Sequence, residues 1–160
     1  MNVTIRDAVP DDLEFLARGN EAMAQETEHK RLDPGTVRRG VATGLNDPAH
    51  GRYFIAEDES SHAVGQLMVT YEWSDWRNGQ FWWIQSVYVV PSARRHGVFR
   101  ALYAHVEQLA RRAGNVCGLR LYVETENVSA QRTYERCGMV DAGYRVLEVD
   151  YTSAAARARE

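Results

Sequence analysis

Hydrophobic and polar residues alternate along the chain with two different periods, and the changes of period divide the sequence into elements. An apolar residue at every second position predicts a strand, and apolar residues three and four apart predict a helix. The predicted strands are residues 3–7, 52–57, 63–73, 79–90, 118–124 and 143–151. The predicted helices lie within residues 9–26, 34–45, 98–113 and 127–136.

This order, β-α-α-β-β-β-α-β-α-β, predicts a single domain of the α/β (α+β) class over residues 1–152, followed by a polar tail at 153–160. Short polar turns join the strands between residues 52 and 90, which predicts an antiparallel meander. The strand, helix and strand that follow need one right-handed crossover. We therefore expect a mixed, mostly antiparallel sheet with helices on both faces.

The composition narrows the classes of function. With 160 residues and 44% hydrophobic content, the chain can bury the core of one ordinary domain. Its net charge of -3 argues against a general nucleic-acid binder, and no apolar stretch reaches the ~18 residues of a membrane span. Cys117 and Cys137 lack metal-ligand spacing, as do the five histidines, so we expect reduced thiols and no metal. The start shows no signal pattern, which favours an unprocessed cytoplasmic protein.

A basic turn that contains glycine joins the strand at 79–90 to the helix at 98–113, in the stretch VYVVPSARRHGVFR. Gly97 permits close approach of a ligand to the backbone, and the start of the helix directs N–H groups and a positive dipole end to one place. Arg94, Arg95 and Arg100 add positive charge. An ordinary turn with solvated arginines has the same pattern, so this turn alone leaves phosphate binding and a purely structural turn both open.

Two motifs in this half of the chain resemble those of the GCN5-related N-acetyltransferase (GNAT) family. The spacing V-x-P-x-x-R/Q-x-x-G-x-G/A is matched from Val89 to Phe99, and E-N-x-x-A-x-x-x-Y-x-x-x-G-F/M is matched by ENVSAQRTYERCGM at residues 126–139. The order of elements also agrees with this family over the whole chain. Phe99 stands where the family has glycine or alanine, so we expect altered packing beside the cofactor and retained binding.

The resemblance implies an enzyme that binds acetyl-CoA and a primary amine in a ternary complex and transfers the acetyl group directly. It places the pyrophosphate on the basic turn and the pantetheine arm beside a fourth strand that bulges and splays from the fifth. Gln85 and Ser86 interrupt the apolar run of that strand, as a bulge would. The implied cofactor-binding residues are Val87, Val89, Arg94, Arg95, His96, Gly97, Val98, Phe99, Arg100, Asn127, Ala130 and Tyr134.

The resemblance also assigns the proton chemistry in part. Tyr134 is implied as the general acid for the leaving thiolate, since a phenol with a pKa of about 10 is protonated at neutral pH. A core tyrosine with a satisfied hydroxyl is the alternative. The strand at 79–90 contains no acid, so the nearest candidates for the base are Glu72 and Glu124, each of which could instead be a solvated charge at a strand end.

The stretch YEWSDWRNGQFWW is the part of the sequence that indicates which class of acceptor the protein binds. Tryptophan faces and carboxylates together suit a cationic amine, although the same hairpin could pack on the core or on the second subunit of a homodimer. The expected acceptor-binding residues are Glu28, Trp73, Asp75, Trp83, Gln85 and Ser86. The rival to an enzyme is a CoA-binding regulatory or scaffold domain without turnover, which the missing acid on the strand at 79–90 favours.

Overall fold

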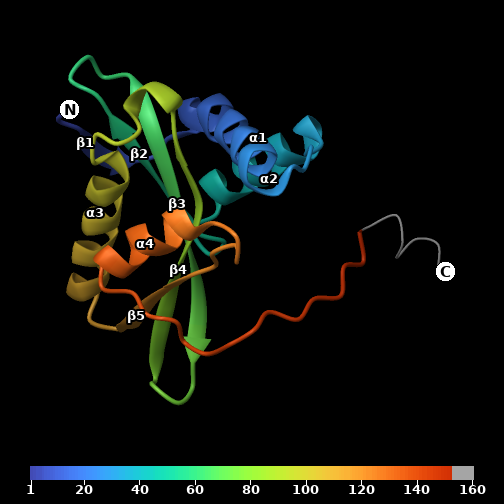
Figure 1. The fold of residues 1–160 in the computed structure, drawn as a ribbon, viewed down its shortest axis with the longest axis vertical. Coiled ribbons are helices and arrows are strands. Elements are labelled where there is room, and N and C mark those ends of the chain that lie inside the picture. Colours follow the sequence, from blue (N-terminus) through green and yellow to red (C-terminus); the bar gives the residue numbers. More distant parts are fainter. Residues whose placement is uncertain (153–160) are drawn as a thin grey trace. The chain divides into compact units, whose positions relative to one another are not determined.

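The computed structural model describes residues 1–152 and divides the chain into two units, residues 1–127 and a second unit that begins at Val128. The expectation of one domain over residues 1–152 stays a prediction. The predicted tail at 153–160 lies outside the described residues. The elements of the first unit are β1 (Thr4–Asp7), α1 (Leu13–Glu28), α2 (Pro34–Asn46), β2 (Arg52–Glu57), β3 (Ala63–Ser74), β4 (Gly79–Val89), α3 (Val98–Arg112) and β5 (Val116–Leu121) (Figure 1).

The strands of the first unit form one sheet in the order β1-β2-β3-β4-β5. Every neighbouring pair is antiparallel except β4 and β5, which are parallel and joined through α3. The predicted mixed, mostly antiparallel sheet is therefore confirmed.

Helices cover both faces of this sheet, as the alternation along β2 shows. The ring of Phe54 meets His105 of α3 edge-on, with 5.3 Å between the ring centroids. The next residue, Ile55, is fully buried in a cluster with Leu16 of α1 and Val41 of α2. Because consecutive strand residues point to opposite faces, α3 packs on one face and the α1–α2 pair on the other (Figure 1).

The strand β5 begins and ends earlier than the sequence pattern predicts. Its ladder with β4 runs from the pair Gln80 and Val116 to the pair Ile84 and Leu121, whereas the alternation of apolar residues predicts a strand at 118–124. Residues 122–124 follow the strand because β4 changes its own geometry just beyond Ile84, where the parallel ladder stops.

The predicted last strand at 143–151 is wrong. In the second unit, α4 (Val128–Arg136) is followed by residues that pair with no strand in the described part of the chain. The side chains of Tyr144, Val146 and Leu147 are exposed. An alternating pattern suits a half-buried strand, but a strand also needs a ladder of backbone hydrogen bonds to a second strand, and the described residues form no such ladder here.

Candidate active site

The edge of β4 that faces β5 is paired over only part of its length. The parallel ladder ends at Ile84 and Leu121, while β4 continues to Val89. Residues 85–89 therefore lie beyond the end of the β5 ladder, so β5 does not pair with their backbone groups on this edge. The splayed fourth and fifth strands expected from the sequence are confirmed.

A bulge lies in this same part of β4. Across the ladder with β3, Gln85 faces Met68 and Tyr88 faces Gln66, so two residues of β4 stand opposite one of β3. The first of the two, Ser86, has a φ of +50°, in the left-handed region that side chains other than glycine rarely adopt. The bulge predicted from the break in the apolar run is confirmed, and it turns the backbone groups of the splayed segment out of the regular ladder.

The turn between β4 and α3 has the geometry of an anion site. Arg95 and Gly97 both adopt left-handed φ values, +64° and +82°. The first helical hydrogen bond of α3 runs from the amide of Ala101 to the carbonyl of Gly97, 3.0 Å away, and an α-helix leaves the amides before its first bond without an intrahelical acceptor. A Cβ built on Gly97 would meet no atom within 4 Å. The turn therefore has the open space, the N–H groups and the helix dipole that a pyrophosphate needs.

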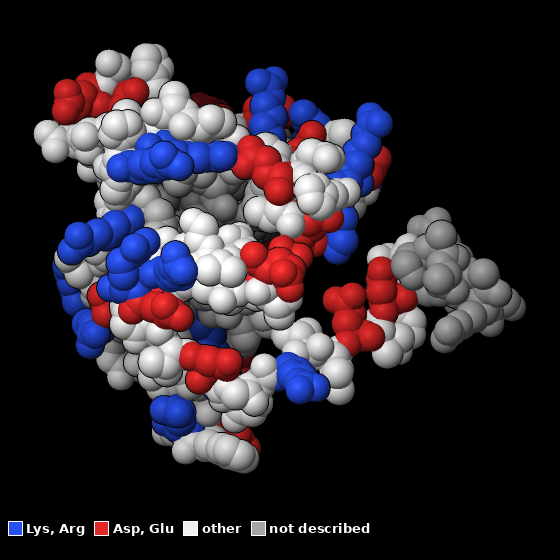
Figure 2. Space-filling model, viewed as in Figure 1, with Lys and Arg blue, Asp and Glu red and all other residues white. Residues whose placement is uncertain are grey.

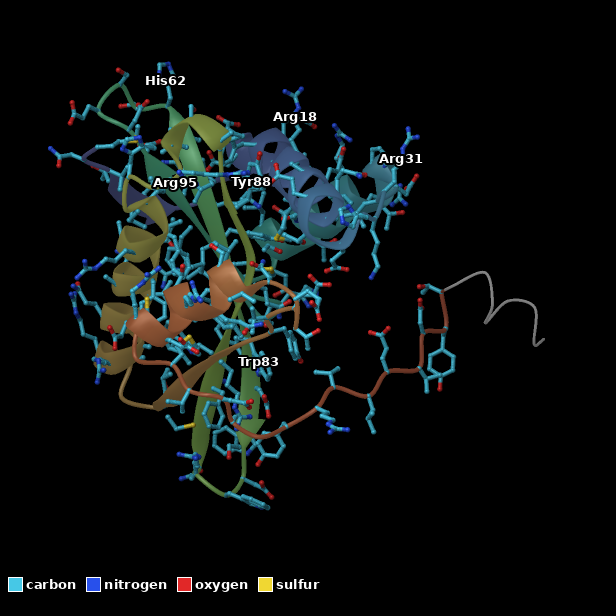
Figure 3. The ribbon with its side chains drawn as sticks, in the orientation of Figure 1. Arg18, Arg31, His62, Trp83, Tyr88 and Arg95 are labelled. Carbon is cyan, nitrogen blue, oxygen red and sulfur yellow. The ribbon has the colours of Figure 1, made fainter. Side chains whose placement is uncertain are left out.

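The arginines of this turn have different environments. Arg94 donates from Nε to the carbonyl of Val89 at 2.9 Å and pairs through Nη2 with Glu26 of α1 at 2.7 Å. Its guanidinium carbon also lies 5.6 Å from the centroid of the Tyr88 ring. The exposed side chain of Arg95 lies beside the end of β4 (Figure 3), and Figure 2 shows a band of basic atoms at that place. Arg94 thus holds the turn against α1, and Arg95 contributes an exposed charge.

The residues that begin α3 also differ in what they can offer a ligand. The side chain of Val98 is buried, and its Cγ1 atom lies 2.8 Å from where a Cβ on Gly65 would be. Only the backbone of Val98 is therefore suited to ligand contact. The ring of Phe99 tilts against Tyr103 one turn along the helix, with centroids 6.1 Å apart. This contact is the local packing that accompanies the departure from glycine or alanine.

A cluster of charged and aromatic side chains lies on one sheet face, across β3, β4 and β5. The carboxylate of Glu72 accepts from the indole Nε1 of Trp83 and from Nη1 of Arg120, the latter at 3.2 and 3.3 Å to its two oxygens. The guanidinium carbon of Arg120 lies 3.6 Å from the centroid of the Phe81 ring, and Trp83 stacks on Tyr122 with centroids 4.4 Å apart. Glu72 is thus held by two donors instead of standing open at a strand end.

The other predicted acceptor residues do not gather around Glu72. Trp73 follows Glu72 in β3, so its side chain points to the opposite face from Trp83. The Asp75 carboxylate lies in the β3–β4 turn and accepts from the amide of Trp76 at 2.9 Å. The structure therefore separates Trp73 and Asp75 from the Glu72 cluster.

The remaining acceptor candidates lie at the end of α1 and in the bulge of β4. Glu28 at the C-terminal end of α1 forms an exposed ion pair with Lys30 at 2.7 Å. The amide of Gln85 donates to the hydroxyl of Thr70 on the face that carries Trp83. Of the six predicted acceptor residues, Trp83, Gln85 and Ser86 lie near one another along β4.

The predicted acid, Tyr134, lies on α4 in the second unit. Ala130 precedes it by four residues, so the two share one helix face, as the sequence predicts. Burial raises the pKa of Tyr134 above its usual range, and the Cys137 thiol acts in the same direction. The phenol therefore keeps its proton throughout the neutral range. Asn127 ends the first unit, where its amide donates to the carbonyl of Glu124 at 3.0 Å.

Two side chains of the site, Gln66 and Arg120, were not predicted from the sequence. Gln66 is fully buried in β3 and contacts the bulge, and Arg120 forms the ion pair with Glu72. Each is a single polar residue within an apolar strand pattern, and this pattern was the only feature of the sequence that could have marked it as part of a site. Their partners lie 20 or more residues away in the sequence, and no local pattern identifies such a partner.

Two kinds of feature are absent from residues 1–152, the part of the chain that the structure describes. The described side chains contain no group of three or more His, Cys, Asp or Glu that could hold a metal ion. No helix in this range has both the length and the apolar character needed to cross a bilayer.

Residues 16–139 match the Acetyltransferase (GNAT) family, and the chain belongs to that family. GNAT acetyltransferases use acetyl-CoA, and the splayed strand and basic turn described above are consistent with its binding. Two curated relatives are mycothiol acetyltransferases, from Mycobacterium avium (strain 104) at 35% identity over 149 residues and from Mycobacterium leprae (strain Br4923) at 30% over 151 residues. These matches cover 85% and 88% of this chain but only 46% and 48% of the relatives, so the chain spans about half their length.

Solved structures agree with the family assignment. A possible acetyltransferase from Clostridium difficile 630 superposes with a TM-score of 0.86 at 42% identity, over 94% of this chain and 98% of that one. A predicted acetyltransferase from Clostridium acetobutylicum, solved with acetyl-CoA, gives a TM-score of 0.75 at 16% identity, over 94% and 97% of the two chains. The second likeness, at its low identity, shows the fold alone.

Proposed function

We propose that this chain is an N-acetyltransferase that transfers the acetyl group of acetyl-CoA directly to a primary amine of a small molecule or a protein. The observation that carries the proposal is the combination, within the first unit, of an unpaired bulged edge of β4 with a basic turn at the start of α3. The edge offers backbone groups to a pantetheine arm, and the turn offers N–H groups and positive charge to a pyrophosphate. These features suit acetyl-CoA in this family.

The proposed binding roles follow these two features. Val87 and Val89 present backbone groups to the pantetheine arm, and the segment from Arg94 to Arg100 holds the pyrophosphate. Asn127 and Ala130 complete the proposed cofactor residues. Direct transfer in a ternary complex is supported by the absence of a nucleophile motif around either cysteine of the sequence.

The proton transfers are assigned to two kinds of group. Tyr134 donates its phenolic proton to the sulfur of CoA as the thioester bond breaks, and its raised pKa keeps that proton in place until then. The amine must lose a proton before or during attack, and Glu72 and Glu124 are the candidate bases. Glu72 has the better defined setting, since Trp83 and Arg120 fix the orientation of its carboxylate.

The acceptor is proposed to be a cationic amine that approaches the Glu72 cluster, where carboxylate and aromatic faces are adjacent. An amine related to mycothiol belongs among the candidates because the curated relatives are mycothiol acetyltransferases. A homodimer and a cytoplasmic location stay predictions; the exposed side chains of Trp73 and Trp76 support an interface on the β3–β4 hairpin.

A panel of acceptors with release of free CoA thiol as the readout tests this proposal. The panel comprises amino acids, polyamines, aminoglycosides, a mycothiol-related amine and lysine peptides, each with acetyl-CoA. Acetyl-CoA consumption that depends on one amine class, with the N-acetyl product found by mass spectrometry, supports the enzyme. CoA binding by calorimetry without turnover on any amine would support the rival, a CoA-binding regulatory domain, which the lack of an acid on β4 favours.

A further inference from the structure

A fully buried glutamine side chain lies directly behind the bulge of β4. Gln66 of β3 is 0% exposed, and its amide nitrogen donates to the carbonyl of Ser86 at 3.3 Å. The same nitrogen donates to the carbonyl of Leu16 at 3.3 Å and to the Oδ1 atom of Asn20 at 2.9 Å, both in α1. One amide group therefore connects the bulge to the helix that covers this face of the sheet.

The residue that this amide holds has an unfavourable backbone conformation. Ser86 has a φ of +50°, and a left-handed conformation is disfavoured for every residue with a Cβ. Such a conformation persists only where its surroundings enforce it, and strained residues of this kind gather at functional sites. The hydrogen bond from Gln66 is one such constraint, because it fixes the direction of the Ser86 carbonyl.

The helix α1 is shaped to admit this side chain. A Cβ built on Gly19 would lie 2.2 Å from Oε1 of Gln66, closer than any real contact. Gly19 is itself buried, and any larger residue there would displace the amide. The position of the Gln66 amide thus depends on a glycine in a different element, the helix α1.

Gln66 is also a costly residue for a protein core. Its Oε1 atom is buried and accepts no hydrogen bond from the described residues, and a buried polar atom without a partner destabilises the fold. An apolar side chain of similar size would avoid that cost. Its presence is explained if the amide nitrogen performs a task that an apolar residue cannot perform.

We propose that Gln66 is a positioning residue for acetyl-CoA, which holds Ser86 in its left-handed conformation so that the backbone of residues 87–89 meets the pantetheine arm. This inference rests on the proposed function, since the arm is the ligand of the splayed edge. Gln66 is fully buried, so it acts through the bulge that it contacts.

The test replaces the amide and then relieves the strain that the amide opposes. Gln66→Met keeps the length of the side chain and removes the donor, and we expect the Kd for CoA to rise about tenfold or more by calorimetry. Adding Ser86→Gly permits the left-handed φ without the hydrogen bond, so the double variant should regain most of the lost affinity. A residue that serves only to fill the core would not be rescued by a change of backbone freedom at another position.

Two further variants keep the test decisive. Val41→Ala creates a cavity in the cluster formed by α1, α2 and β2 and removes no hydrogen bond of Gln66, so it should lower stability and leave the Kd for CoA within about twofold of wild type. Gly19→Ala displaces the amide while Gln66 itself is retained, so it should weaken CoA binding in the same direction even if Gln66→Met does not fold.

The carbonyl ¹³C chemical shift of Ser86 separates this inference from the proposed function. We expect Gln66→Met to move this shift away from its left-handed value, and Ser86→Gly to bring back the left-handed value at residue 86 in the double variant. If Gln66→Met binds CoA as wild type does, or if the double variant shows no recovery, the inference is overturned. If the wild-type protein binds no CoA at all, the proposed function fails, while the carbonyl shift still decides whether Gln66 holds the bulge.

Discussion

Arg94 and Glu26 are 68 residues apart in the sequence, and their side chains form an ion pair of 2.7 Å between Nη2 and Oε2. The pair joins the turn that precedes α3 to the C-terminal half of α1. Both side chains are partly exposed, at 41% and 43%, so the pair itself contributes only about 0–1 kcal/mol to folding. Its larger effect is on the charge that Arg94 presents beside the proposed pyrophosphate site.

Opposite effects on CoA affinity are expected from the two partners of this pair. Arg94→Met removes a positive charge and should raise the Kd for CoA several-fold, with a weaker dependence on salt. Glu26→Gln removes the competing negative charge and should lower the Kd by a few-fold. Calorimetry at two salt concentrations measures both effects. If both variants weaken binding equally, Arg94 serves only to attach the turn to α1.

Gly97 and Gly114 provide a matched pair of substitutions at the two ends of α3. Both have left-handed φ values, +82° and +74°, and a Cβ on either would meet no atom within 4 Å. Valine at either position should therefore cost a similar 1–2 kcal/mol or so of folding free energy through backbone strain alone. Only Gly97→Val should also obstruct the phosphate turn and raise the Kd for CoA about tenfold, or about 1.4 kcal/mol. Equal CoA affinities in the two variants would remove this turn from the site.

Tyr134→Phe separates the proposed acid from a tyrosine that serves only in packing. Loss of the hydroxyl should lower kcat on the order of a hundredfold, with little change in acetyl-CoA binding and about 1 kcal/mol of lost stability. Tyr151→Phe, at an exposed position of the same unit, is the control and should match wild type. A folded Tyr134→Phe protein with wild-type kcat at neutral pH would leave the proton to water.

The raised pKa of Tyr134 also predicts how the protein responds to alkaline pH. The folded state favours the protonated phenol, so its contribution to stability is complete below the unfolded pKa of about 10 and is lost as the pH rises through the higher folded value. Burial shifts the pKa values of Tyr53 and Tyr71 in the same direction. Chemical unfolding from pH 8 to 11 should show stability that falls above pH 10, and the fall should be smaller in Tyr134→Phe.

Glu72 and Arg120 should have opposite effects on the choice of acceptor. Glu72→Gln removes the carboxylate that is proposed to attract a cationic amine, so the ratio of kcat/KM for cationic over neutral acceptors should fall. Arg120→Gln removes the cation that now pairs with Glu72, and the same ratio should rise. Glu59→Gln changes an exposed carboxylate elsewhere and should leave the ratio unchanged. If the two cluster variants give the wild-type ratio, the cluster is structural and the acceptor binds elsewhere.

Local patterns predicted those features of the fold that depend on neighbouring residues. The strand at 52–57 agrees with the structure at both ends, and the break at Gln85 and Ser86 located the bulge correctly. The end of β5 was missed because it depends on where β4 departs from its ladder. The strand expected at 143–151 was wrong because alternation describes one side of a pairing and gives no information about the partner.

The sequence predicted the parts of the site whose geometry is set by a local motif. It did not predict the contacts that join segments far apart in the sequence. The motif placed a glycine turn between strand and helix, and the structure has such a turn there, with Gly97 at a left-handed φ. The contact of Gln66 with the bulge and the pairing of Glu72 with Arg120 involve separate strands, and the pairing of Arg94 with Glu26 joins a turn to a helix. Glutamate at a strand end suggested an open carboxylate, but the fold brings a guanidinium to it from a strand that lies 48 residues further along.

The β3–β4 hairpin also gives this protein a set of internal fluorescent reporters. Trp76 is 91% exposed and Trp82 only 9%, so acrylamide quenches the first readily and the second poorly. Trp83 stacks on Tyr122, and its indole N–H is bound to a carboxylate, which makes its emission sensitive to any molecule that enters the cluster. With Trp73 and Trp76 replaced by phenylalanine, entry of a molecule into the cluster can therefore be followed as a spectral change in real time, without acetyl transfer and without an added label.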